Sequence, residues 1–183
     1  LLPQLSVRVG ERVRTNSEAI LAVESRTEGA NWNDHIAITS GIYADSATHI
    51  EMVRFNRGSD ALFGLLTLLT DGGGRVPRVL RFAAQVLRHP VRFARGLWPV
   101  GQASRSTVIL AMQAAEGHLS LEWKRRWWRL GRRSLNSRAL PGVARPSSYI
   151  PVANEVARRL AARMDGTPKS SWSEVLYDAP STA

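Results

Sequence analysis

The feature that most restricts the fold is a series of three apolar stretches of strand length near the start of the chain. They span residues 19–24, 36–43 and 48–55, and in the third of them the side chains alternate in character along the strand. Loops rich in Gly, Asn and Asp separate the three stretches, as the turns of a meandering antiparallel sheet require. The first third of the chain therefore predicts antiparallel strands.

Helices are predicted next. Asp60 can cap a helix over residues 62–69, which a run of glycines then ends. Prolines begin two further helices, at 77–88 and at 90–98, because proline is favoured in the first helical turn. The middle of the chain thus predicts a helical segment inserted between strands.

The remainder returns to strands. Residues 106–113 and 119–123 are predicted to pair as a hairpin, and a further short strand falls within 127–136. The clearest helix spans 151–164, where apolar residues recur at every fourth position, and 173–177 is predicted as a closing strand. This order predicts an α+β fold, an antiparallel β-sheet with helices packed on one face, rather than a doubly wound α/β domain.

The charge of the chain is strongly biased. It has 183 residues, enough to bury a core as one domain or as one domain with pieces of another, and a net charge of +10. No acidic residue occurs between Gly72 and Ala115, where several arginines fall. Such a bias predicts an anionic partner, either a lipid surface or nucleic acid.

Much of this charge lies on the predicted helices at 77–97. On a helical projection one side carries Arg78, Arg81, Arg88, Arg92 and Arg95, and apolar residues take the opposite side. Such a helix can lie in a lipid headgroup layer, which predicts a peripheral membrane contact through 77–97. The alternative is that the apolar side packs on the sheet and the arginines stay in solvent. With no DNA- or RNA-binding signature and dispersed aromatic residues, we expect no nucleic-acid partner.

Several kinds of site are not expected. The absence of cysteine excludes a disulfide framework and cysteine-based zinc sites. None of the histidines has metal-ligand spacing with another histidine or a carboxylate cluster, so we expect no metal. The glycines at 72–74 lack the G-x-G-x-x-G spacing of a dinucleotide fingerprint and predict a flexible loop. With no signal peptide and no apolar run that could span a bilayer, we expect a cytoplasmic protein, membrane-associated if 77–97 meets lipid.

A polar corner precedes the first strand. Gly10 permits a positive φ or a close backbone approach. The short side chains of Thr15, Asn16 and Ser17 can satisfy backbone donors in a tight turn. Such a corner either supports a ligand or is an ordinary turn before a strand, and the residues alone leave both readings open.

Three stretches together resemble one family. They are the corner at 6–23, the stretch Tyr-Ile-Pro-Val-Ala-Asn-Glu at 149–155, and the ending at 174–183. These stretches resemble the FAD-dependent glucose-methanol-choline (GMC) oxidoreductases, with the cholesterol-oxidase-like branch as the nearest match. In that family the ending runs directly into a stretch that carries the catalytic histidine. The resemblance therefore implies an interior piece of a longer protein, with its catalytic residues just beyond Ala183.

The resemblance also implies a domain plan and site residues. It assigns 1–18 to the junction with an FAD-binding domain, and 19–170 to a GMC-type substrate-binding domain with a helical lid at 60–98. It assigns 171–183 to a return toward the FAD-binding domain. The residues implied to contact the cofactor FAD are Gly10, Thr15, Asn16 and Ser17. Those implied to contact the substrate are Ser181, Thr182 and Ala183.

The implied reaction is oxidation of the CH–OH group of a bulky apolar alcohol, such as a sterol, with hydride transfer to flavin N5. The isolated piece is expected to be inactive. One departure bears on the substrate: the related branch carries a glutamate before the strand matched to 107–112, and residues 100–105 contain no carboxylate. This departure puts steroid specificity in doubt. The alternative function is a basic amphipathic binding module for an anionic membrane surface or nucleic acid.

Overall fold

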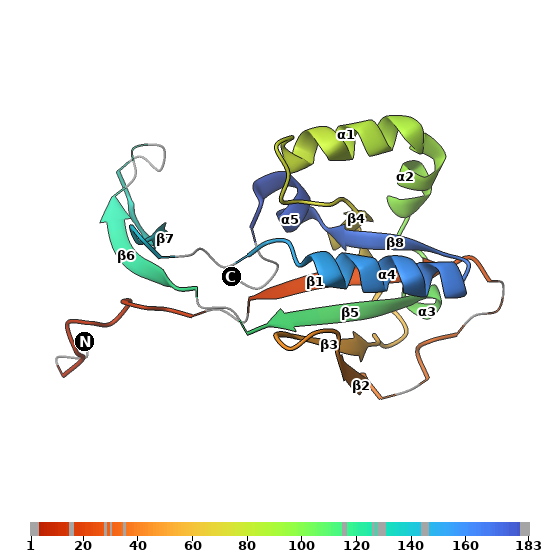
Figure 1. Ribbon diagram of the computed structural model, residues 1–183, viewed down its shortest axis with the longest axis horizontal. Coiled ribbons are helices and arrows are strands. Elements are labelled where there is room, and N and C mark those ends of the chain that lie inside the picture. The colour runs from red at the N-terminus through yellow and green to blue at the C-terminus, as the bar shows by residue number, and fades with distance from the viewer. Residues whose placement is uncertain are drawn as a thin grey trace. The chain divides into compact units, whose positions relative to one another are not determined.

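The computed structural model divides the chain into two units (Figure 1). The first, called here the small unit, joins Leu1–Thr15 to Ala115–Pro146, and the second, the sheet unit, joins Asn16–Ala114 to Ser147–Ala183. The residues that the structure describes are 4–14, 17–27, 29, 31–34, 36–114, 117–125, 127, 131–143 and 147–179.

A six-stranded sheet forms the centre of the sheet unit. Its strands are β1 (Glu18–Ser25), β2 (Ile38–Tyr43), β3 (Thr48–Val53), β4 (Leu66–Leu68), β5 (Ser106–Gln113) and β8 (Gly166–Ser171). They lie in the order β2-β3-β5-β1-β8-β4, and every pair of neighbours is antiparallel. The antiparallel sheet predicted from the sequence is confirmed.

The order of the strands differs from the predicted meander. Two strands, β3 and β5, stand between β1 and β2, and only β2 and β3 are neighbours both in the chain and in the sheet. The central strand β1 pairs with segments that follow much later, so that Leu21 lies opposite both Ile109 and Ser170. Such pairings between distant segments leave no local signal in the sequence.

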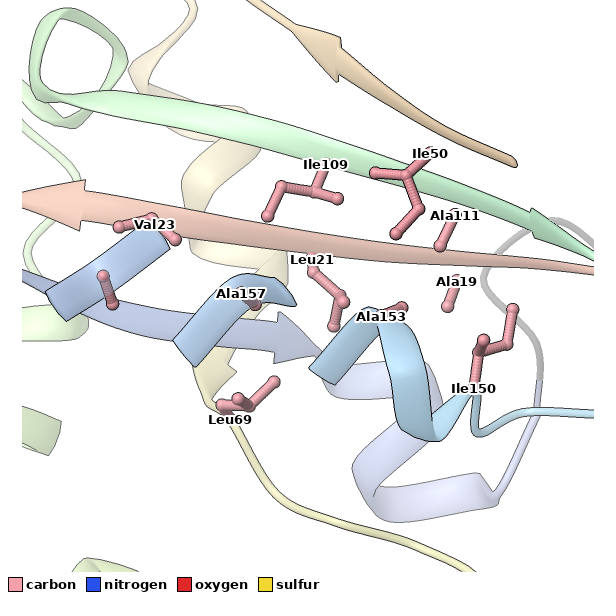
Figure 2. Packing of buried hydrophobic residues seen from close by; sticks show 11 residues of the cluster. Ala19, Leu21, Val23, Ile50, Leu69, Ile109, Ala111, Ile150, Ala153 and Ala157 are labelled. Atoms are coloured by element: carbon pink, nitrogen blue, oxygen red, sulfur yellow. The ribbon is translucent and has the colours of Figure 1, made fainter. Parts of the chain in front are cut away.

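Helix α4 (Pro151–Arg163) covers one face of this sheet, as predicted. Alternate residues of β1 and β5, including Leu21 and Ile109, point toward this helix. The helix contributes small residues to this contact, Ala153 and Ala157, which are fully buried against the strands (Figure 2). Alanines at these positions leave room for the larger side chains of the sheet, so the helix can pack closely against the strands.

The opposite face of the sheet is also covered. Ala22 and Val108 point away from α4 and pack with Phe63 and Ala103 in a second buried cluster. These two residues belong to the short helices η1 (Asp60–Leu65) and α3 (Gln102–Arg105). The prediction that helices pack on one face only is therefore wrong. The helix predicted at 62–69 is also shorter than expected, since η1 ends at Leu65 and the chain then enters strand β4.

Helices α1 (Arg78–Arg88) and α2 (Pro90–Gly96) lie beside edge strand β4 (Figure 1). They begin at or directly after Pro77 and Pro90, as predicted. A third cluster joins them to α5 (Trp172–Tyr177) through buried Phe82 and its neighbours Phe93 and Trp172. The ring centroid of Phe82 lies 5.4 Å from that of Trp172 and 5.9 Å from that of Phe93. These edge-to-face contacts stabilise the helices against the sheet.

One local prediction near the end of the chain is wrong. The strand predicted at 173–177 is helix α5, because the Ser171 hydroxyl accepts a hydrogen bond from the backbone N–H of Glu174 and caps a helix there. Residues 166–171, which follow helix α4, form strand β8, which was not predicted. Pro168 is tolerated there because the pairing of β8 with β4 extends only from Lys169 to Ser171.

The small unit contains the two-stranded sheet of β6 (Leu119–Arg125) and β7 (Arg133–Ala139). Val13 extends it by an isolated bridge to Leu119. The predicted hairpin between 106–113 and 119–123 is wrong, because β5 pairs with β1 and β3 while β6 pairs with β7.

Asp60 caps a helix other than the one predicted. Helix η1 has no side-chain cap, whereas the Asp60 carboxylate accepts hydrogen bonds of 2.8 Å from the backbone N–H groups of Gly101 and Ala103 at the start of α3. The bond from Ala103, followed by that from Gly101, lowers the pKa of Asp60.

We expect Asp60→Ala to lower the free energy of unfolding by about 1 kcal/mol at neutral pH, because two backbone donors lose their acceptor. Since the folded-state pKa lies below 3.8, this stabilisation is complete above pH 3.8 and is lost as the pH falls below that value. Urea denaturation of the unaltered protein and of Asp60→Ala, at neutral pH and in acid, measures this difference in stability. A difference that does not shrink in acid would contradict it.

Candidate functional site

An apolar pocket of about 240 Å³ opens on the face of the sheet opposite α4. Three parts of the sheet unit line it: the sheet, the segment around η1, and the start of α5. The lining residues are Ile20, Phe55, Leu62, Phe63, Leu65, Leu66, Val108, Ser171, Trp172 and Ser173. We call this cavity the apolar pocket.

The sequence builds this pocket from side chains that alternate along the strands. Ile20 and Val108 point away from α4 and form its floor. In η1, Phe63 is buried and its ring meets that of Phe55 edge-to-face at 5.8 Å. Leu62 and Leu65 of the same short helix are 44% and 63% exposed, so they stand at the mouth.

The chemistry of the pocket is that of a binding surface. Its polar side chains are Ser171 and Ser173, whose hydroxyls lie 2.7 Å apart and hydrogen-bond to each other. None of its lining residues is titratable. A mainly apolar cavity with few polar groups binds the apolar body of a ligand, whereas proton transfer needs a group that the pocket does not contain.

A buried ion pair supports the pocket. Arg78 and Glu174 lie 3.2 Å apart, and their side chains are 4% and 1% exposed. The Arg78 guanidinium also donates to the carbonyls of Thr70 and Ser148, at 2.9 and 3.0 Å. The other carboxylate oxygen of Glu174 accepts a bond of 3.2 Å from the backbone N–H of Ile20 in the pocket floor. The pair therefore fixes α5, which carries Trp172, to strand β1.

The placement of Arg78 corrects the predicted orientation of helix α1. Arg78 is buried, and Arg81 donates to the backbone carbonyls of Asp71 and Gly72. Among the apolar residues, Leu80 and Leu87 face solvent, with exposed fractions of 58% and 82%. The expectation that the apolar side packs on the sheet while all the arginines stay in solvent is wrong, because these two arginines find inward acceptors. In the part of the chain that the structure describes, no helix is long and apolar enough to cross a membrane.

The segment that leads to the predicted substrate contacts is held in place as far as it is described. The Ser148 hydroxyl donates to the Asp178 carboxylate, and the backbone N–H of Ala179 donates to the Ser173 carbonyl at 3.3 Å. The predicted substrate residues Ser181, Thr182 and Ala183 lie outside the described residues. Two of the predicted cofactor residues, Thr15 and Asn16, also lie outside them.

Gly10 and Ser17, the other predicted cofactor residues, have contacts within the chain. In the small unit, Gly10 has a φ of +93°, and an added Cβ would lie 2.6 Å from the carbonyl oxygen of Leu121. In the sheet unit, Ser17 is 3% exposed, and its carbonyl accepts a bond from Gln113. Close packing thus explains the glycine at position 10, and flavin contact at these positions stays a prediction.

The described residues among those predicted to contact the cofactor use their backbone carbonyls within the chain. The carbonyls of Gly10 and Ser17 accept hydrogen bonds from Leu121 and Gln113, and the apolar pocket has no cation to meet a pyrophosphate. The described residues also contain no group of three or more His, Cys, Asp or Glu side chains that could hold a metal ion.

A second buried ionic group lies away from the pocket and was not predicted. The Lys169 side chain is 3% exposed, and its ammonium lies 2.7 Å from the Glu24 carboxylate. It also donates to the side-chain carbonyl of Gln102 at 2.6 Å. Burial lowers the pKa of Lys169, although the nearby Glu24 acts in the opposite direction. The sequence signal was weak, because Lys169 follows a proline in a stretch that resembles a loop.

Comparisons with known proteins support the resemblance seen in the sequence. The whole chain aligns with a cholesterol oxidase of Acinetobacter baumannii at 34% identity over 184 residues, 32% of that protein. It aligns with the cholesterol oxidases of two Mycobacterium tuberculosis strains, CDC 1551 and H37Rv, at 36% identity over 188 residues, 32% of each. The chain spans about a third of the length of these curated relatives. No family model and no solved structure matches. Over its full length, the chain is thus similar to one part of proteins named cholesterol oxidase.

Proposed function

We propose that this chain is the substrate-binding portion of an FAD-dependent oxidoreductase of GMC type that acts on the CH–OH group of a bulky apolar alcohol. Flavin N5, held by parts of a longer protein, would accept the hydride. The catalytic residues would follow Ala183 in that protein. The observation that carries the proposal is an apolar pocket in a chain similar over its full length to proteins named cholesterol oxidase.

The chemistry of the pocket supports a binding role. Burying apolar surface stabilises a complex by about 25 cal/mol per Å², so the leucine and aromatic walls favour a hydrocarbon body over a polar one. The volume of about 240 Å³ is below the range of roughly 300 Å³ and more that holds a complete drug-sized ligand. The chain would therefore supply one wall of a larger site, which a sterol-like alcohol would fill together with the flavin-bearing portion. The domain plan of junction 1–18, substrate domain 19–170 and return 171–183 belongs to this proposal.

A substitution at the pocket mouth tests the role of the pocket. Leu65→Asp places a charge where the apolar body would enter, and we expect it to raise KM for a sterol-like alcohol by about tenfold or more, since a lost leucine contact is worth roughly 1.5 kcal/mol. The melting temperature should change little, because Leu65 is 63% exposed. The measurement is steady-state oxidation by the full-length protein that carries this chain.

Ile42→Asp is the matched control. Ile42 is 55% exposed on edge strand β2, outside the pocket. It should leave KM unchanged. Equal effects of the two substitutions on KM would contradict a role for the pocket in substrate binding. A full-length protein that shows no absorbance from a bound flavin would contradict the flavin-dependent reaction.

A further inference from the structure

A basic pocket of about 380 Å³ lies where α1 meets α2, beside strands β1 and β8. It is distinct from the apolar pocket, with which it shares no lining residue. Its charged lining residues are Glu24, Arg26, Arg88, Arg92, Arg95 and Lys169. Five cationic side chains thus surround a cavity that contains one carboxylate.

The single carboxylate does not neutralise these cations. Glu24 is already paired with Lys169 at 2.7 Å and with Arg105 at 3.3 Å. Arg26 pairs with Asp165. Within the described residues, no carboxylate forms an ion pair with the remaining three arginines. These are Arg88, Arg92 and Arg95. Like charges held together without a counter-charge repel each other, so an anion that enters the pocket is strongly favoured.

A buried glutamine holds in place the end of helix α2, which carries Arg92 and Arg95, and also the side chain of Lys169. The fully buried side chain of Gln102 donates to the carbonyls of Gly96 and Trp98 at the end of α2, at 3.2 and 2.6 Å. The same amide accepts from Lys169 at 2.6 Å. A Cβ added to Gly96 would lie 3.9 Å from the Lys169 ammonium, so α2 passes close to it. Gln102 therefore fixes α2, with its arginines, against the buried lysine before any ligand arrives.

We infer that this basic pocket binds a phosphate group. The guanidinium fork matches two phosphate oxygens at once, and Arg92 and Arg95 stand three residues apart on one helix, where side chains are neighbours. The exposed apolar side chains of Leu87 and Val91, 82% and 61% accessible, flank the arginines. Cations beside apolar side chains suit the phosphate of a lipid headgroup, whose acyl chains would meet the leucine and valine. This inference does not depend on the proposed reaction.

Two pairs of charge reversals test the inference in the full-length protein that carries this chain. Arg92→Glu with Arg95→Glu alters the pocket, and Arg133→Glu with Arg138→Glu makes the same change in net charge on exposed arginines of β7 in the small unit. Binding is measured to vesicles of phosphatidylcholine with and without phosphatidylglycerol. We expect the pocket pair to weaken binding to the anionic vesicles by about 30-fold or more, and the β7 pair by about threefold or less.

A second arm identifies the source of the phosphate. Titration with pyrophosphate measures a soluble ligand, and addition of pyrophosphate to the vesicle assay measures competition. Loss of vesicle binding in the pocket pair without competition assigns a lipid headgroup, whereas pyrophosphate binding that the same pair abolishes assigns a soluble phosphate compound. Either result supports the phosphate site. Equal weakening by both pairs, or no binding of either probe by the unaltered protein, overturns it.

The single variant Arg88→Gln keeps the inference testable if the Arg92→Glu, Arg95→Glu double variant fails to fold. It removes one cation from an exposed position and leaves Arg92 and Arg95 intact. We expect it to weaken binding of the same probe by about fivefold with an unchanged melting temperature. Unchanged binding in Arg88→Gln, together with an unfolded pocket pair, would also count against the site.

Discussion

Replacing Arg78 with alanine should lower the free energy of unfolding by about 3–5 kcal/mol, because it leaves a buried carboxylate without its partner. Glu174 is 1% exposed, so water cannot replace the lost guanidinium. The carbonyls of Thr70 and Ser148 lose their donor at the same time. For a chain of this size the melting temperature should fall by roughly 10 °C. Urea and thermal denaturation measure both quantities.

Arg75→Ala is the control for this prediction. Arg75 precedes the same helix, is exposed, and forms no ion pair with any carboxylate that the structure describes. Its replacement should change the stability by about 0.5 kcal/mol or less. Arg78→Lys should fall between the two, because it keeps the charge but not the planar fork that reaches several acceptors. Similar losses in Arg78→Ala and Arg75→Ala would show that the buried pair does not hold the sheet unit together.

The same ion pair connects stability to the apolar pocket. Glu174 binds the backbone N–H of Ile20 in the pocket floor, and its helix α5 begins with Trp172 in the pocket wall. A variant that loosens Glu174 should therefore disturb the pocket before the whole sheet unfolds. The exposed edge strand β2 has no such connection, which is why Ile42 serves as a control for ligand binding.

Elements with a strong local pattern could be predicted from the sequence. The apolar stretches at β1 and β5, the proline starts of α1 and α2, and the four-residue spacing in α4 each follow from a rule that acts over a few residues. Elements decided by distant contacts could not. The strand β8 contains a proline and a lysine, and it forms because β1 and β4 offer hydrogen bonds on its two sides.

The orientation of α1 shows the same limit. A helical projection separates arginines from apolar residues, but it cannot tell which side will find partners. Arg78 turns inward because it pairs with Glu174 and donates to the backbone carbonyls of Thr70 and Ser148, and Glu174 and Ser148 lie far away in the chain. Its apolar neighbours Leu80 and Leu87 consequently remain in solvent.

The candidate site also could not be predicted from patterns that act over a few neighbouring residues. The apolar pocket combines Ile20, Val108 and Trp172, which come together only once the strand order is known. The residues predicted from the family resemblance lie near the ends of the chain instead. Among them, only Gly10 and Ser17 fall within the described residues, so the resemblance and the pocket are independent arguments for the proposed function.

The second large effect is expected at the buried lysine. Glu24→Gln removes the charge that Lys169 meets at 2.7 Å, and the lysine side chain is only 3% exposed. We expect the free energy of unfolding to fall by about 3 kcal/mol at neutral pH, near the lower end for a broken buried pair because the amide still offers an acceptor. Glu155→Gln, which breaks the exposed pair with Arg159 on α4, should cost about 0.5 kcal/mol or less.

The pH dependence distinguishes a buried charge from a lost contact. Burial already lowers the pKa of Lys169 below 10.5, and removal of Glu24 should lower it further. Above its folded-state pKa the lysine is neutral in the folded chain while the unfolded chain still binds the proton, so stability rises with pH up to 10.5. The deficit of Glu24→Gln should therefore shrink as the pH is raised from neutral toward that value. Adding Lys169→Met should recover most of the lost stability, since no buried charge remains, and a double variant as unstable as the single one would contradict this account.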